Sequence, residues 1–116
     1  MKNERIFLAA TGRVLARAEK TGDQWEVTRP LEGVKVNCII NHPNNPRTVY
    51  IGTQKEGILV SQDAGNRWQS SGLKGIPVKS LAGEPSDPST LYAGCKPVSL
   101  YMSRDGGDTW NELEAI

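Results

Sequence analysis

The feature that most constrains the fold of this sequence is an internal repeat of 42 residues. Three tryptophans, Trp25, Trp68 and Trp110, are separated by 43 and 42 residues. A shift of 42 needs no gap across the second and third units. The residues that coincide with an identical type are Val36 with Val78, Pro43 with Pro85, Pro46 with Pro88, Thr48 with Thr90, Tyr50 with Tyr92, and Gly52 with Gly94. Repeats of this length are typical of stacked architectures in which each unit is one supersecondary motif.

The first unit is a shorter and more divergent copy. Under a shift of 43 the coinciding residues are Phe7 with Tyr50, Gly22 with Gly65, and Trp25 with Trp68. Ala18 and Lys20 stand where the second unit has a serine and an aspartate. We therefore expect the first unit to keep the packing residues of the repeat and to have lost its polar ones.

Each complete unit is predicted to form four short antiparallel strands. These are residues 36–40, 48–53, 58–61 and 67–70 in the second unit, and 78–82, 90–95, 100–103 and 109–113 in the third. Residues 42–46 and 84–88 are rich in Pro, Asn and Asp, which favours turns, and proline cannot donate to a sheet ladder. Four strands in about 42 residues is the size of a β-propeller blade.

The predicted fold class is therefore all-β, a partial β-propeller of about three four-stranded antiparallel blades. The chain is expected to be a single repeat array over residues 1–116, with blade 1 at 5–30, blade 2 at 34–73 and blade 3 at 76–116. Blade 1 is expected to be incomplete, because residues 5–10 match the second strand of the later units. The apolar run in residues 6–10 is too short for the core of a signal peptide, so it is also read as a strand.

A polar motif closes the second and third units. It reads S-x-D-x-G-x-x-W in both, and its residues are Ser61, Asp63, Gly65 and Trp68, and Ser103, Asp105, Gly107 and Trp110. An aspartate can accept hydrogen bonds from turn amides, and a glycine can adopt the positive φ of a tight turn. We expect these residues to build the hairpin between the third and fourth strands of each blade and to have no catalytic role.

Both motifs resemble Asp boxes, also called bacterial neuraminidase repeats. The chain is similar to the β-propeller superfamily that includes sialidases, sortilin-type ectodomains and photosystem II stability factors, and above all to uncharacterised prokaryotic repeat proteins of that kind. The resemblance implies a propeller with its Asp boxes on the outer rim. It carries no activity by itself.

The residues of a sialidase-like or glycosyl hydrolase-like site could not be placed. No arginine matches the carboxylate-binding triad of sialidases, and Tyr50 and Tyr92 recur in the repeat, which favours a packing role. His42 lies in a turn, and Cys38 and Cys95 lack the spacing of metal ligands. Residues 105–108 belong to the Asp box and lack the pattern of a calcium loop. We expect no catalytic residue, metal or cofactor.

The charge balance argues against some classes of partner. Lys and Arg number 14 against 13 Asp and Glu, a net charge of +1. This balance gives no overall electrostatic signature of a nucleic-acid or membrane-surface protein. No run of residues is long enough for a membrane span, and we expect a cytoplasmic protein.

A closed propeller has about four to eight blades. Two readings follow: further C-terminal blades belong to a longer protein, or copies of the chain associate to complete a ring. The favoured function is a non-catalytic binding or scaffold module for a protein or small ligand. The alternative is the N-terminal part of a sialidase-like glycoside hydrolase whose catalytic residues lie mostly elsewhere. Ligand contacts are expected in the loops that differ between the repeats, at Gln54, Lys55, Glu56, Lys96 and Pro97.

Overall fold

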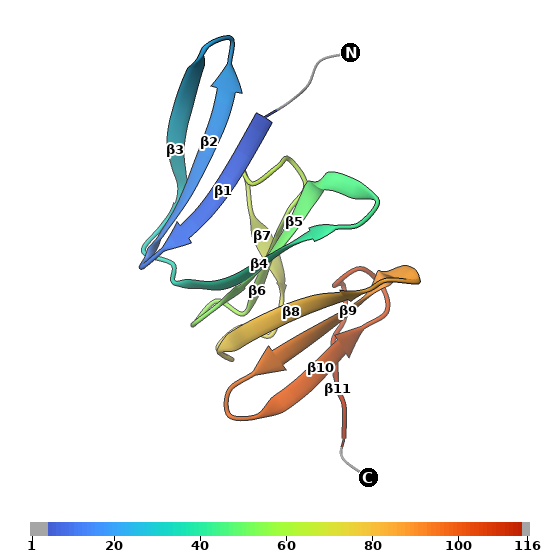
Figure 1. The fold of residues 1–116 in the computed structure, drawn as a ribbon. Coiled ribbons are helices and arrows are strands. Elements are labelled where there is room, and N and C mark those ends of the chain that lie inside the picture. Colours follow the sequence, from blue (N-terminus) through green and yellow to red (C-terminus); the bar gives the residue numbers. More distant parts are fainter. Residues whose placement is uncertain (1–4, 115–116) are drawn as a thin grey trace.

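The computed structural model describes residues 5–114, which form three antiparallel sheets that follow one another along the chain (Figure 1). The strand orders are β1-β2-β3, β4-β5-β6-β7 and β8-β9-β10-β11. The strands are β1 (Arg5–Thr11), β2 (Val14–Thr21), β3 (Gln24–Glu32), β4 (Val36–His42), β5 (Asn45–Thr53), β6 (Ile58–Ser61), β7 (Gln69–Gly72), β8 (Val78–Glu84), β9 (Asp87–Cys95), β10 (Ser99–Ser103) and β11 (Asn111–Glu112). Within residues 5–114 there is no helix of the length and apolarity needed to cross a membrane.

The second and third sheets repeat one another in strand register. Ile39 pairs with Ile51 in the second sheet, and Leu81 pairs with Ala93 at the equivalent positions of the third. Each first strand also carries an irregularity at the same place, between Val36 and Cys38 and between Val78 and Ser80. The predicted all-β fold of propeller blades is confirmed, with consecutive strands joined as hairpins.

The core lies where the second and third sheets face each other. Ile58, Val78, Ala93 and Cys95 are buried there, and Cys38 packs against them. The strands approach closely at Gly52, because a Cβ placed there would lie 2.6 Å from both the Cys38 sulfur and a Val78 methyl carbon. The glycine of the repeat is therefore required by packing between the sheets.

Within residues 5–114, the first sheet has three strands and no counterpart of β4 or β8, as the sequence predicts for an incomplete first blade. Its strand β1 corresponds to β5 of the second sheet. β4 lies beside β8, whereas β1 is the strand of the first sheet that comes closest to β4 (Figure 1).

The predicted alignment of the first unit is wrong by one residue along β1. Leu8, and not Phe7, takes the place of Tyr50, because the Leu8 side chain lies against Gly65 as Tyr50 lies against Gly107. Phe7 is 64% exposed and Trp25 is 52% exposed, so neither packs between sheets. The cause is the tight turn at Gly22 and Asp23, which replaces the longer turn of the later units and leaves Trp25 inside β3.

The predicted strand ends also differ from those observed. The fourth strands begin at Gln69 and Asn111, two residues later than expected, because the motif turns continue through their tryptophans. The turn predicted at residues 42–46 is shorter, since Asn45 already pairs with His42 at the start of β5.

Candidate functional site

The serine and aspartate of the second unit organise the turn between β6 and β7. Ser61 Oγ accepts a hydrogen bond from the Gly65 amide and donates one to Asp63 Oδ1, both at 2.8 Å. Asp63 Oδ1 also accepts the amides of Asn66 at 3.1 Å and Arg67 at 2.8 Å. These hydrogen bonds, led by that from the Arg67 amide, lower the pKa of Asp63.

The turn between β10 and β11 is built in the same way. Ser103 Oγ accepts the Gly107 amide and donates to Asp105 Oδ1, each at 2.8 Å. Asp105 accepts the Thr109 hydroxyl at 2.6 Å and the Thr109 amide at 2.9 Å, and these bonds, together with that from Ser103, lower its pKa from 3.8 to about 2. An aspartate whose acceptor oxygens are committed to its own turn is poorly suited to proton transfer.

The glycines and tryptophans complete the two motif turns. Gly65 and Gly107 have φ of 89° and 97°. The Trp68 indole donates to the Gly65 carbonyl at 2.9 Å, and the Trp110 indole donates to the Ser71 carbonyl of the neighbouring sheet at 2.8 Å. All eight motif residues named from the sequence thus lie together in two turns at the same end of their sheets.

Each motif turn also receives a hydrogen bond from the preceding sheet. Arg17 Nε donates to the Ala64 carbonyl at 2.9 Å, and the Tyr50 hydroxyl donates to the Gly106 carbonyl at 2.9 Å. Ala64 and Gly106 are 42 residues apart, so the acceptors are equivalent although the donors differ. Each of these two bonds links one sheet to the motif turn of the next.

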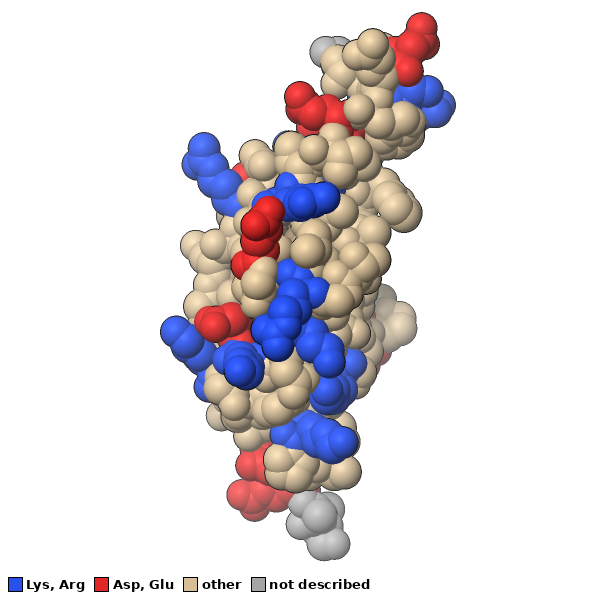
Figure 2. Space-filling model, turned by 90° about the vertical axis from the view of Figure 1, so that its left-hand side faces the viewer, with Lys and Arg blue, Asp and Glu red and all other residues tan. Residues whose placement is uncertain are grey.

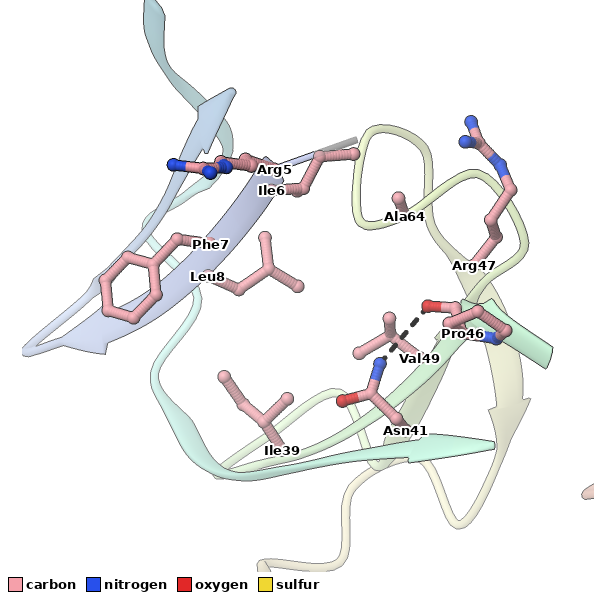
Figure 3. Close-up of a pocket in the computed structure, with 10 residues that line it drawn as sticks. All are labelled: Arg5, Ile6, Phe7, Leu8, Ile39, Asn41, Pro46, Arg47, Val49 and Ala64. Atoms are coloured by element: carbon pink, nitrogen blue, oxygen red, sulfur yellow. Dashed lines mark hydrogen bonds between the residues drawn. The ribbon is translucent and has the colours of Figure 1, made fainter. Parts of the chain in front are cut away.

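A groove of about 900 Å³ separates the first sheet from the second (Figure 3). Its apolar walls come from Ile6 and Leu8 on β1 and from Ile39 and Val49 on β4 and β5. The remaining lining residues are Arg5, Phe7, Asn41, Pro46, Arg47 and Ala64. None of these ten lining residues, all within residues 5–114, is a carboxylate, histidine, cysteine, serine or lysine, so these ten supply no general base or nucleophile.

The position of the groove follows from the missing strand of the first sheet. In the second sheet, β4 covers the inner edge of β5 and packs towards β8. In the first sheet, among residues 5–114, no strand pairs with the corresponding edge of β1. The groove therefore lies where an innermost strand of the first sheet would lie, beside an unpaired edge and over an apolar floor.

The loops singled out from the sequence lie at the opposite end of the sheets from the motif turns. Gln54, Lys55 and Glu56 connect β5 to β6, and Lys96 and Pro97 connect β9 to β10. Lys55, Lys96 and Pro97 are exposed. Gln54 is held in place because its side-chain oxygen accepts hydrogen bonds from Lys79 Nζ at 2.8 Å and Asn37 Nδ2 at 3.2 Å.

Of the remaining candidates for chemistry, Cys38 and Cys95 share the core between the second and third sheets, whereas His42 lies at the end of β4. Burial raises the pKa of the Cys38 and Cys95 thiols, which favours their unreactive protonated form. His42 ends β4, and its Nδ1 accepts the Asn44 amide at 3.1 Å. In the described part of the chain, no three His, Cys, Asp or Glu side chains are grouped so that they could hold a metal ion.

Comparison with known families decides the wider relationship. The family model Sortilin-Vps10, described as "Sortilin, neurotensin receptor 3", matches residues 13–115. The chain belongs to the Sortilin-Vps10 family. No curated protein matches the sequence. Membership agrees with the superfamily suggested by the repeat and its motifs.

Solved structures similar to this Sortilin-Vps10 chain share its fold at low sequence identity. An ancestral GH74 enzyme has a TM-score of 0.68 at 17% identity over 90% of this chain and 17% of its own. The GH74 enzyme of Niastella koreensis has a TM-score of 0.64 at 20% identity over 94% of this chain and 20% of its own. A structure titled "YCF48 bound to D1 peptide" has a TM-score of 0.66 at 13% identity over 95% of this chain and 38% of its own. The chain thus spans less than two fifths of each of these structures.

Sequence reasoning did not find the groove. Its lining combines residues from β1, β4, β5 and the Ala64 turn, which no local motif connects. The one available signal was the absent first strand of the first unit, which implies an uncovered strand edge.

Proposed function

We propose that this chain is a non-catalytic binding module that holds an extended segment of a protein in the groove between the first and second sheets. The observation that carries the proposal is the edge of β1, which has no partner strand among residues 5–114 and borders an apolar floor. A strand added at a sheet edge gains main-chain hydrogen bonds, and alternate side chains gain pockets.

The repeat itself provides a template for the bound segment. β4 pairs antiparallel with β5, and β8 pairs antiparallel with β9, at the place that is uncovered in the first sheet. A segment bound in this way would run antiparallel to β1 and direct alternate side chains towards Ile39 and Val49. We expect the side chains that enter the groove to be small and apolar. Between the second and third sheets the equivalent place is filled by Cys38 of β4.

Peptide binding has a precedent on this fold. One structural neighbour, YCF48, is a propeller described as bound to a peptide. The likeness to the GH74 enzymes rests on the fold at 17% and 20% identity and brings no activity with it. The groove residues that the structure describes include no paired carboxylates of the kind that glycoside hydrolysis requires.

The test is a selection of random peptides displayed on phage against the whole chain. We expect the selected peptides to alternate apolar and polar residues and to protect β1 amides from hydrogen exchange when bound. Ile39→Lys should abolish their binding, because it places a charge on the groove floor, whereas Val98→Lys, at a loop residue 98% exposed, should not.

A second groove variant, Ile6→Lys, keeps the test decisive if Ile39→Lys unfolds the chain. Peptides that bind both groove variants as well as the parent chain, or that protect strands other than β1, would show that the groove is not the binding site.

A further inference from the structure

The strand topology places five connections at one end of the three sheets, and we call these residues the loop end. They are residues 12–13, 32–35, 54–57, 73–77 and 96–98. The loop end lies on the side of the molecule away from the motif turns and is viewed face-on in Figure 2. It is separate from the groove lining, with which it shares no residue.

Positive charge is concentrated on the loop end and at the start of β8. The exposed cations are Arg13, Lys35, Lys55, Lys74, Lys79 and Lys96. The nearby carboxylates are Glu56, Glu32 at the end of β3, and Glu112 at the end of β11, which lies close enough to Cys95 to add to burial in raising its pKa. Figure 2 shows Lys and Arg side chains gathered down the middle of this face, with fewer Asp and Glu among them. The near-neutral net charge of the chain is therefore compatible with a local excess of positive charge at the loop end.

The basic residues are held by hydrogen bonds that recur from sheet to sheet. The Arg13 and Lys55 carbonyls accept the amides of Gly33 and Gly75, at 2.9 and 3.0 Å. The Lys35 carbonyl accepts the Gln54 amide at 3.0 Å, and Lys96 donates its amide to Pro77 at the same distance. These contacts fix the backbone that carries the cations, which limits the entropy lost when a partner binds.

The carboxylates on the loop end neutralise little of this charge. Lys74 Nζ lies 3.9 Å from Glu56 Oε1, and their side chains are 74% and 46% exposed, which makes a weak, solvent-screened pair. The Lys79 ammonium donates to the neutral Gln54 amide and keeps its charge. A cavity of about 80 Å³ is lined by three cations, Arg13, Lys35 and Lys55, and by one carboxylate, Glu56, so cations outnumber carboxylates in its lining.

We infer that the loop end binds an acidic segment of a partner protein, independently of the groove. The cations provide the complementary charge, and Val98, which is 98% exposed beside Lys96, provides an apolar contact of the kind found in protein interfaces. The five connections contribute no aromatic ring on which a nucleotide base could stack, which favours a peptide over a single-stranded nucleic acid.

The probe for this surface is a fluorescein-labelled Glu-rich peptide, with the same peptide carrying Gln for Glu as its reference. Fluorescence anisotropy with the whole chain should show binding of the acidic peptide, and affinity should fall several-fold between about 50 and about 200 mM salt because the charges are exposed. The double variant Lys55→Glu/Lys96→Glu should weaken binding by about tenfold or more.

The matched control is Lys20→Glu/Arg104→Glu, which makes the same change in net charge away from the loop end and should bind like the parent chain. Equal weakening by both double variants would overturn the inference, as would equal binding of the Gln peptide. Tighter binding to single-stranded RNA or to vesicles rich in phosphatidylserine, at the same salt, would show that the surface serves another class of partner. A milder double variant, Lys55→Gln/Lys96→Gln, replaces the first if that one does not fold.

Discussion

At the scale of single residues, the two motif turns show how one hydroxyl and one carboxylate can order a loop. Ser61 and Ser103 are each 1% exposed and bond both a glycine amide and the neighbouring aspartate. Each serine thus gives the buried amide of its glycine a hydrogen-bond partner. The hydrogen bonds that each aspartate accepts favour its charged form and lower its pKa. The motif therefore orders the turn in which it lies.

Acid should weaken the turn of the third sheet in a defined window of pH. The pKa of Asp105 is about 2 in the folded chain against an ordinary value of 3.8, so its contribution to stability is complete above 3.8 and is lost as the pH falls towards 2. Urea unfolding midpoints of the parent chain and of Asp105→Asn should differ at neutral pH and converge below about pH 4.

Asp23→Asn, in the turn between β2 and β3, is the control for loss of one negative charge. A difference between the parent chain and Asp105→Asn that stays constant down to pH 2 would contradict the assignment of the turn hydrogen bonds to an ionised Asp105.

At the scale of elements, neighbouring sheets are joined by a donor on one sheet and a carbonyl in the next motif turn. Tyr50 forms this link between the second and third sheets. Tyr92, at the same position of the next unit, has no further sheet beside it within residues 5–114 and donates instead to Glu84 Oε2 at 3.2 Å. The same side chain thus has two different partners in one molecule.

This difference gives a matched pair of variants. Tyr50→Phe should lower the free energy of unfolding by about 1 kcal/mol, because it leaves the Gly106 carbonyl without its partner. Tyr92→Phe removes a longer bond to a solvated carboxylate and should cost less. Urea unfolding followed by circular dichroism measures the free energy of unfolding of both variants. Equal losses would show that the hydrogen bond between sheets stabilises the chain no more than the exposed one to Glu84 does.

The parts of this fold that could be predicted are those that depend on residues close together in the sequence. Strands, turns and sheet number followed from the repeat, because proline, glycine and aspartate act on their own neighbourhood. The orientation of β1 did not, because Trp25 was used as the landmark and a slip of one residue turns every side chain of a strand to the other face. The groove required knowledge of how two sheets are placed.

At the scale of the whole molecule, the three sheets form an elongated array of 55 × 32 × 17 Å. Its first sheet turns one face to solvent, where Phe7, Ala18 and Val27 form a row across β1, β2 and β3. Phe7 and Val27 are 64% and 63% exposed, and Leu100 on the third sheet is 55% exposed. The contiguous apolar row on the first sheet favours association.

The chain is therefore expected to associate in solution. Light scattering after size-exclusion chromatography should give a molar mass above the 12.7 kDa of one chain. Val27→Lys should shift the mass towards that of a monomer, whereas Gln62→Lys, at an exposed residue of the turn after β6, should not. A monomeric parent chain, or an equal effect of both variants, would contradict a role for this face.

The link between sheets has a consequence for how such chains diverge. Its acceptor is a main-chain carbonyl, which is present whatever residue occupies the position, and its donor is an arginine in one case and a tyrosine in the other. Mutation can therefore exchange one donor for another without loss of the joint. A joint of this kind can persist while the side chains that form it change, so neighbouring blades can diverge in sequence and keep their arrangement.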